Sequence, residues 1–392
     1  MKSEWNTSAI ANICKVVTDG SHTSPKSVSH GKYMVSVKDF TPYGFDFNGC
    51  RQISFADYEK LKSSGCVPQK GDILIGKDGA RYFEDIIIYN QDEAPALLSS
   101  IAILRCDEEK VIPEYLYYLL KTPSFKKDVK DNYGSGSAIP RIILKDFKRM
   151  KVEYPSIEKQ RQIVSILHDL DAKIFNNQKV NDNLDQQAAA LFSSLYNRSN
   201  TEVRYTDLIQ ILGGGTPKTG ETAYWNGNIA FFTPKDVGTP YTFITEKTIT
   251  EEGLSHCNSR LYPVNTVFVT ARGTVGKVGL SGVPMAMNQS CYALVGKETH
   301  QLLVYFYTLK VVDKLKHKAS GAVFDAITTR DFESEQIMKL SDDDARAFLC
   351  VAEPMFQDIL NNSIENLRLS TLRDFLLPKL MSGEIDVSNI QF

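Results

Sequence analysis

The sequence lacks any apolar run long enough to cross a membrane. Its longest apolar-aromatic runs, such as residues 302–309, fall far short of the about 20 residues that a bilayer requires. It also lacks the continuous apolar segment of a signal peptide near its start, where Lys2, Glu4 and Asn6 interrupt the apolar residues. Both absences predict a cytoplasmic protein.

Closely spaced pairs of metal-ligating side chains are missing too. The 7 cysteines are scattered without a CxxC pair, and the 6 histidines show neither HxH nor HxxxH spacing. Zinc sites use such pairs, so we predict no metal site. An odd number of scattered cysteines is instead typical of buried, reduced thiols in the cytosol.

The sequence lacks the motifs of enzymes that act on DNA. It has neither a Gly-rich cofactor loop nor the Asn/Asp-Pro-Pro-Tyr/Phe motif of an adenine methyltransferase. The string closest to a P-loop, residues 271–278, lacks the first glycine and the last hydroxyl residue of that motif. A Glu-x-Lys triplet at residues 108–110 has no convincing acidic partner in a strand context. We therefore predict no catalytic residue and no bound cofactor.

A positive net charge is missing as well, since 45 basic residues face 47 acidic ones and the formal charge is −2. Free-standing nucleic-acid binders tend to be basic, so the overall charge argues mildly against one. Basic residues are nevertheless concentrated locally, in residues 121–151 and, less strongly, in residues 310–318. Such stretches suit contacts with phosphates, although a solvated helix face is an equally ordinary explanation.

What the sequence does have is an internal repeat. Sliding it along itself until Lys-Asp-Phe at 145–147 meets Arg-Asp-Phe at 330–332 also brings together two long helical stretches, one just after each triplet. In both stretches seam residues recur in alternating steps of four and three, the spacing of a coiled coil. The seam comprises Ile163, Leu167, Leu170, Ile174, Asn177, Asn181, Leu184, Leu191 and Leu195, and then Met355, Ile359, Asn362, Asn366, Leu369, Leu376 and Leu380, with Ala188 and Arg373 at the two remaining positions of the pattern.

Two asparagines occupy equivalent seam positions in the two helices. In the same alignment of the sequence with itself, Asn177 and Asn181 fall on Asn362 and Asn366. Buried asparagines weaken a seam but fix its register and its partner. The repeat therefore predicts that the two helices pair with each other, most simply in antiparallel fashion. The alternative is two unrelated amphipathic helices that pack on separate cores.

The segments before the two helices also resemble each other and are rich in short β-type runs broken by glycine and proline. A chain of 392 residues is long enough for two such cores. We predict an α+β protein with two similar modules, joined by two long helices that form an antiparallel coiled coil. The expected boundaries are residues 1–155 and 200–340 for the modules, 156–199 for the central helix and 341–392 for the second helix and tail.

Two phrases in this frame resemble the specificity subunit of type I restriction–modification enzymes. They are Pro-Ser-Ile-Glu-Lys-Gln-Arg-Gln-Ile-Val at residues 155–164 and Leu-Leu-Pro-Lys-Leu-Met-Ser-Gly-Glu-Ile at residues 376–385. The order of modules and helices matches that family along essentially the whole chain. The second helix departs from the pattern, since acidic residues 342–344 replace the Glu-Gln-Arg phrase and Arg373 occupies a seam position where the first helix has Ala188.

The resemblance implies a protein that reads DNA and catalyses nothing alone. Each module would be a target-recognition domain for one half of a bipartite, asymmetric site in double-stranded DNA, and the coiled coil would set the spacing. Two methyltransferase subunits, which would bind S-adenosylmethionine, would dock on the helices, and restriction–translocase subunits can join through them. The rival hypothesis is a non-catalytic protein scaffold of two α+β modules on a coiled coil.

Polar, glycine-punctuated loops are the expected places for DNA contacts, because side chains read base edges from the major groove. We place Arg81 and Arg272 at comparable points of the repeat, where an arginine suits guanine O6 and N7. For each single candidate, a solvated surface residue is the ordinary alternative. The candidates are Ser24, Lys26, Lys38, Lys77, Arg81, Ser135, Ser137 and Arg141 in the first module, and Thr216, Lys218, Thr219, Lys235, Arg272, Lys277, Asn288 and Gln289 in the second.

Overall fold

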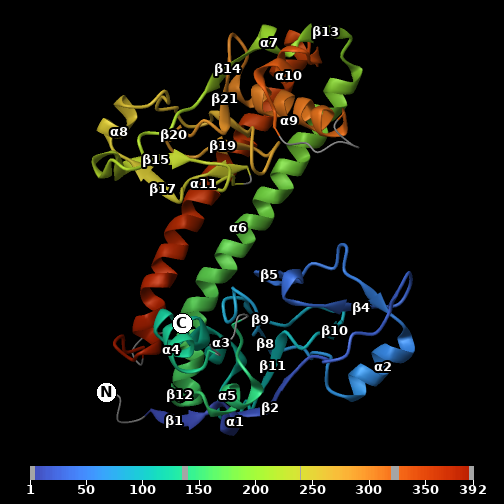
Figure 1. The fold of residues 1–392 in the computed structure, drawn as a ribbon, viewed down its shortest axis with the longest axis vertical. Coiled ribbons are helices and arrows are strands. Elements are labelled where there is room, and N and C mark those ends of the chain that lie inside the picture. The colour runs from blue at the N-terminus through green and yellow to red at the C-terminus, as the bar shows by residue number, and fades with distance from the viewer. Residues whose placement is uncertain (1–4, 135–139, 239, 319–325, 388–392) are drawn as a thin grey trace. The chain divides into compact units, whose positions relative to one another are not determined.

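A computed structural model of the chain describes residues 5–134, 140–238, 240–318 and 326–387. Packing divides the chain into two compact units: unit 1 comprises residues 1–173 and 368–392, and unit 2 comprises residues 174–367. Each unit contains one strand-rich module packed on parts of two long helices, α6 (Ile157–Arg198) and α11 (Asp342–Met381) (Figure 1). The predicted α+β class with two similar modules and two long helices is confirmed.

The first module contains two four-stranded sheets. One is antiparallel with the order β2–β11–β8–β9, formed by Cys14–Asp19, Ile101–Cys106, Ile73–Gly76 and Ile86–Ile88. The other has the order β10–β4–β7–β3, formed by Ala96–Leu97, Lys32–Val35, Gln52–Ile53 and Ser27–Val28, and its β10–β4 pair is parallel.

Shorter elements complete the first module. Strand β1 pairs with β12 directly before α6, and β5 pairs with β6 in a hairpin. The bounds are Asn6–Ala9 for β1, Lys151–Tyr154 for β12, Phe40–Thr41 for β5, Gly44–Phe45 for β6, Ile10–Ile13 for α1, Phe55–Ser63 for α2, Pro113–Lys121 for α3, Pro123–Asn132 for α4 and Leu144–Arg149 for α5.

The second module repeats this plan with a five-stranded and a three-stranded sheet. Its first sheet has the order β14–β21–β18–β19–β16, formed by Ile209–Gly213, Cys291–Gly296, Val267–Thr270, Val278–Ser281 and Tyr241–Thr242. Its second sheet has the order β17–β15–β20, formed by Lys247–Ile249, Trp225–Phe232 and Met285–Met287. The β15–β20 pair is parallel, like β10–β4 in the first module.

Its remaining elements also have counterparts. Strand β13 (Thr201–Arg204) pairs with β22 (Gln336–Lys339) before α11, as β1 pairs with β12 before α6. The helices are Tyr205–Leu208 for α7, Glu251–Ser255 for α8, Gln301–Lys318 for α9 and Thr329–Glu333 for α10. No helix among the described residues is both long and apolar enough to cross a bilayer.

The structure also reveals a repeat that the sequence comparison missed. Residues 41–45 read Thr-Pro-Tyr-Gly-Phe and residues 239–243 read Thr-Pro-Tyr-Thr-Phe. Just before them, the carboxylates of Asp39 and Asp236 accept hydrogen bonds from the backbone and hydroxyl of Ser36 and Thr233, respectively. The spacing between these two five-residue sequences is wider than the spacing between the two long helices, so a single shift of the sequence does not align both.

The cores explain why each module packs on the helices. In unit 1, Leu116 of α3, Leu167 of α6 and Leu380 of α11 belong to one buried cluster. In unit 2, the ring of Phe192 on α6 lies 5.1 Å from that of Phe306 on α9 and 5.5 Å from that of Phe348 on α11. Each long helix is therefore both a coiled-coil partner and part of a module core.

Candidate nucleic-acid interface

A hollow of about 430 Å³ in the second module collects three of the predicted DNA contacts, Lys235, Arg272 and Asn288. The three residues closely follow the ends of β15, β18 and β20, respectively. The parallel β15–β20 pair brings Lys235 and Asn288 together, and Arg272, which follows a strand of the other sheet, is joined to the same place by its N–H, which donates to the Ser290 carbonyl at 3.3 Å. The predicted residues at this place form one site.

Arg272 owes its exposed position to a glycine turn. The Gly276 N–H donates to the Thr270 carbonyl at 2.8 Å, and the Thr270 N–H donates to the Lys277 carbonyl at 3.0 Å, which closes the turn. Gly273 has φ +83°, a backbone conformation that side chains other than glycine's rarely allow. The turn is thus fixed while the Arg272 side chain is exposed.

Positive charge dominates the hollow. Lys235, Lys247 and Arg272 line it together with a single carboxylate, Glu246, whose side chain lies 3.5 Å from the Lys235 ammonium. Sequence reasoning missed Lys247, which lies over the Trp225 ring at 5.5 Å from its centroid. The only signal for it was its place beside the strand-forming residues 248–249. Three cations around one carboxylate suit a phosphate-bearing ligand.

The other predicted residues of the second module lie outside this hollow. The Thr216 hydroxyl donates to the Gln289 side chain, so these two are neighbours. Lys277 lines a different hollow, together with Lys316. Lys218 and Thr219 are exposed on the loop before β15.

In the first module, Lys77 does not reach the surface. Its side chain is 8% exposed and its ammonium lies 3.4 Å from the Asp19 carboxylate and 3.6 Å from that of Asp78. Because the Lys77 N–H donates to the Ser100 carbonyl at 2.9 Å, the backbone continues the β8–β11 pairing and directs this side chain inward. Lys77 is better explained as a buried ion-pair partner than as an exposed contact.

The proposed equivalence of Arg81 and Arg272 is wrong. Gly79 (φ +94°) corresponds to Gly273, and backbone bridges join Asp78 to Arg141 and Arg272 to Ala326. Asp78 therefore occupies the place of Arg272, and the arginine of the first module comes from the opposite side of the bridge. Arg81 lies further along the turn, where it pairs with Asp85 at 2.8 Å. The turn between β8 and β9 is also longer than the turn between β18 and β19.

The remaining predicted DNA contacts of the first module lie at the surface or outside the described residues. Ser24, Lys26, Lys38 and Arg141 are exposed. Ser135 and Ser137 lie outside the described residues. The side chains of the exposed candidates do not line the hollow of unit 1 that lies at Lys151 and Met381.

The helix pair has the geometry of a seam. In unit 2 the Asn177 amide donates to the Asn366 side-chain oxygen at 2.9 Å, and the Asn362 amide donates to that of Asn181 at 2.9 Å. The contacts descend along α11 as they ascend along α6, so the helices are antiparallel. All the seam residues predicted from the heptads are buried or half-buried. Phe192, outside the predicted seam, is more fully buried than its neighbour Leu191, because α9 and α11 both pack on it.

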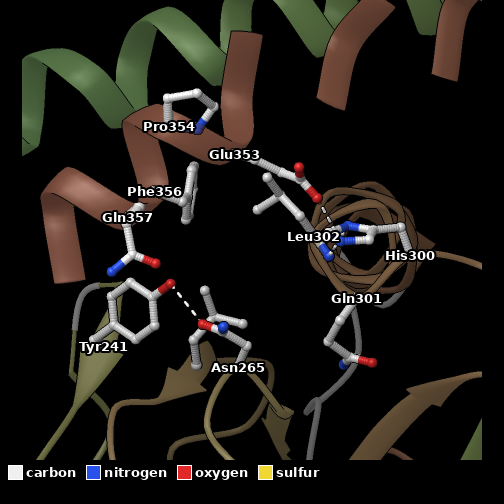
Figure 2. Close-up of a pocket in the computed structure, with 10 residues that line it drawn as sticks. Tyr241, Asn265, His300, Gln301, Leu302, Glu353, Pro354, Phe356 and Gln357 are labelled. Carbon is white, nitrogen blue, oxygen red and sulfur yellow. Dashed lines mark hydrogen bonds and ion pairs between the residues drawn. The ribbon is translucent and has the colours of Figure 1, made fainter. Parts of the chain in front are cut away.

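A second hollow of about 400 Å³ lies in unit 2 where the second module meets α11 (Figure 2). The Tyr241 hydroxyl donates to the Asn265 side chain at 2.8 Å, and His300 pairs with Glu353 of α11 at 2.6 Å. Residues predicted to contact DNA do not line it. In the described part of the chain, no three His, Cys, Asp or Glu side chains are grouped closely enough to hold a metal ion.

Comparisons with known proteins agree on one family. The sequence model described as type I restriction modification DNA specificity domain matches residues 2–186 and 197–339. The HindI specificity subunit of Haemophilus influenzae is 24% identical over 406 residues, covering 81% of this chain and 87% of that protein. The MjaIX specificity subunit of Methanocaldococcus jannaschii is 24% identical over 310 residues, covering 72% of this chain and 71% of that protein.

A solved structure shares the fold. The crystal structure of the S subunit of a type I restriction–modification system from M. genitalium aligns with a TM-score of 0.59. The alignment covers 96% of each chain at 15% sequence identity. It therefore supports the arrangement of strands and helices described above, independently of the sequence match.

Proposed function

This chain belongs to the family of type I restriction–modification DNA specificity proteins, and from that premise we propose how it reads DNA. Each module contacts one half of a bipartite target, and the helix pair holds the two modules in one protein. The observation that supports this most directly is the cationic hollow of the second module, where Lys235, Arg272 and Asn288 meet.

The chemistry of that hollow matches a base edge bordered by phosphates. Arginine donates two parallel hydrogen bonds to guanine O6 and N7, and asparagine can pair with adenine N6 and N7. Lysines placed beside them neutralise phosphates and position the protein without selecting a sequence. We propose that Arg272 and Asn288 read bases while Lys235 and Lys247 bind the backbone.

The two modules differ at the equivalent place. The first has Asp78 bridged to Arg141 where the second has Arg272 bridged to Ala326. A carboxylate accepts from cytosine N4, whereas an arginine donates to guanine. The two half-sites should therefore differ, and the whole target should be asymmetric, unlike the palindrome that a symmetric dimer requires.

The protein acts in a complex in this proposal. The helix pair docks two methyltransferase subunits, which supply S-adenosylmethionine and the catalytic residues, and restriction–translocase subunits join through them. The chain itself contributes sequence recognition. The absence of methyltransferase and P-loop motifs in the sequence supports this division of roles.

The test is to express the chain with the methyltransferase subunit encoded beside it and to map adenine methylation across the genome. One bipartite, asymmetric motif with a fixed unspecified gap is the expected result, and exchanging residues 200–332 for those of a relative should change one half only. A complex that forms without methylating any motif contradicts the proposal. If no complex forms and the chain binds DNA no better than a neutral protein, the scaffold hypothesis replaces it.

A further inference from the structure

An ion pair crosses the helix seam in unit 1. The Arg373 guanidinium of α11 donates to Asp171 of α6 at 2.7 Å and to the neighbouring Asp374 at 2.8 Å. Both partners of the Arg373–Asp171 pair have side chains that are 25% exposed. The arginine in the predicted seam is therefore paired, and it ties the two helices together.

The same carboxylate also binds the first module. The Tyr118 hydroxyl of α3 donates to the second oxygen of Asp171 at 2.7 Å, and Tyr118 is only 4% exposed. Asp171 thus accepts from α3 with one oxygen and from α11 with the other. We call Tyr118, Asp171 and Arg373 the first junction.

Other groups close around this junction. Lys121 donates to the Tyr117 hydroxyl at 2.7 Å, and burial lowers the pKa of its ammonium. The pKa of Tyr43, in the Thr-Pro-Tyr turn, is raised first by burial and then by the charge of Asp171. The turn and α3 therefore both approach Asp171, which makes this carboxylate a polar contact point between the module and the helices.

Unit 2 uses different chemistry at the equivalent positions. The alignment that superimposes the two seams places Asp171 on Phe356 and Arg373 on Ala188, which is fully buried. The Phe356 ring packs against Phe306 of α9 at 5.6 Å and against Tyr241 of β16, in the second Thr-Pro-Tyr sequence, at 6.5 Å. Figure 2 shows Phe356 on α11 beside Tyr241. The second junction is aromatic where the first is ionic.

The two chemistries constrain orientation differently. An aromatic cluster gains its energy from buried area and tolerates small shifts. A carboxylate shared between a hydroxyl and a guanidinium requires three groups at fixed distances and angles. Removing one partner leaves the others half-buried without their hydrogen bonds.

We propose that Arg373 is a positioning residue for the first module: through Asp171 and Tyr118 it fixes the orientation in which that module meets its half-site. This inference rests on the proposed function. Arg373 touches no DNA in this scheme. Its loss should weaken selection of the first half-site and leave the second unchanged, although α11 belongs to both units.

Two substitutions separate the parts of the junction. Arg373→Met removes the ion pair between the helices but keeps a long side chain, and Tyr118→Phe removes only the hydroxyl that joins α3 to Asp171. Tyr115→Phe is the matched control, because Tyr115 lies on the same helix and its hydroxyl donates to the Glu153 carbonyl at 3.4 Å instead. Arg373→Lys keeps the positive charge and should retain part of the discrimination at the first half-site that Arg373→Met loses.

The measurement uses the full chain in complex with its methyltransferase and the bipartite duplex found by methylation mapping. Dissociation constants are compared for the intact duplex and for duplexes with one half scrambled. Arg272→Ala shows which half belongs to the second module. Arg373→Met and Tyr118→Phe should each reduce discrimination at the half-site of the first module by roughly tenfold. Discrimination at the half-site of the second module, which Arg272→Ala identifies, should change by less than about twofold.

A second measurement does not depend on DNA. Backbone hydrogen exchange in the full chain should become faster in α3 in both variants and stay unchanged in α9. Equal loss of discrimination at both halves, or no change in α3 exchange, would overturn the proposal. A wild-type complex that recognises no bipartite duplex would contradict the proposed function alone, and hydrogen exchange would still decide the role of Arg373. If Arg373→Met does not fold, Tyr118→Phe tests the link from Asp171 to α3 and Arg373→Lys tests the guanidinium, and unchanged discrimination in both would overturn the proposal.

Discussion

The Gln160 side chain accepts a hydrogen bond from the Ile112 N–H at 2.9 Å and is itself fully buried. Its amide donates to the carbonyls of Lys110 and Pro155, each at 2.9 Å. One side chain of α6 thus holds the loop before α3 and the chain that enters the helix. Gln160 belongs to the segment 155–164 that resembles the specificity family. In the structure this segment joins the first module to the start of α6.

Replacing Gln160 by methionine keeps the volume and removes all three hydrogen bonds. The Pro155 carbonyl would be left buried without a partner, at a cost of about 1–3 kcal/mol before relaxation, and the half-buried Ile112 N–H and the carbonyl of the exposed Lys110 would lose theirs at a smaller cost. We expect a loss of about 3 kcal/mol in unfolding free energy. Urea denaturation measures it. The half-buried Gln162 is the control, and Gln162→Met should change stability by no more than about 0.5 kcal/mol. Equal effects of the two substitutions would refute the role of Gln160.

The asparagine contacts in the seam predict a non-additive pair. Asn181→Leu removes the acceptor of the Asn362 amide and should destabilise unit 2 by about 1–2 kcal/mol. The double variant Asn181→Leu, Asn362→Leu has no orphaned amide and should recover most of that loss. Chemical denaturation of the full chain measures both. Additive losses, or an equal loss in the exposed control Asn176→Leu, would speak against a paired seam.

Arg272 should affect the recognition of one base pair. Arg272→Ala is expected to weaken binding of the cognate duplex by about 1–3 kcal/mol and to relax selection at a single position of one half-site. Lys247→Ala should instead weaken binding to all sequences and reduce its salt dependence. Competition binding with single-base variants of the duplex distinguishes these outcomes. Arg204, exposed on β13 outside the hollow, supplies the control.

Glu84 should make stability depend on pH. It accepts from Lys126 at 2.8 Å and from Lys130 at 2.5 Å, and these hydrogen bonds lower the pKa of its carboxyl group. A lowered folded-state pKa stabilises the fold above the unfolded value, about 4.3, and this gain disappears as pH falls through the folded pKa.

The corresponding variant is Glu84→Gln. Its melting temperature should lie about 1–2 °C below that of the wild type at pH 7, because the pair is partly exposed. The difference should shrink below about pH 4. Thermal melts across pH measure it, with Glu109→Gln as an exposed control. A difference that persists unchanged at low pH would mean that packing, not charge, explains the effect.

Periodic features were predictable from the sequence, whereas loop geometry was not. The seam around Asn177 and Asn362 follows a heptad rule that depends only on local spacing. The direction of Lys77, in contrast, depends on Asp19, which meets it only through the folded sheet. Lys247 reaches the cationic hollow for a similar reason, because β17 pairs with β15 and so places Lys247 opposite Phe231, near the end of β15 that Lys235 follows.

Insertions explain why loop residues of the two modules could not be matched correctly from the sequence. The shift that aligns the two Thr-Pro-Tyr sequences is larger than the shift that aligns the two long helices. Insertions must therefore lie between these sequences and the helices. Residue types alone pair Arg81 with Arg272, although the backbone bridges show that Asp78 takes that place. The candidate DNA contacts depend on such turns, which is why residue types could be predicted but not their exact equivalence.

The two asparagine contacts are related by an approximate twofold symmetry of the helix pair. Exchanging each residue for its counterpart in the repeat turns the Asn177–Asn366 contact into the Asn362–Asn181 contact. The asparagines alone would therefore accept α6 of another molecule as readily as α11 of their own. In such an exchange Asp171 would lose its partner Arg373 and face Ala188, and Arg198 would lose its partner Asp344, so both ion pairs favour the pairing of α6 with α11 of the same chain.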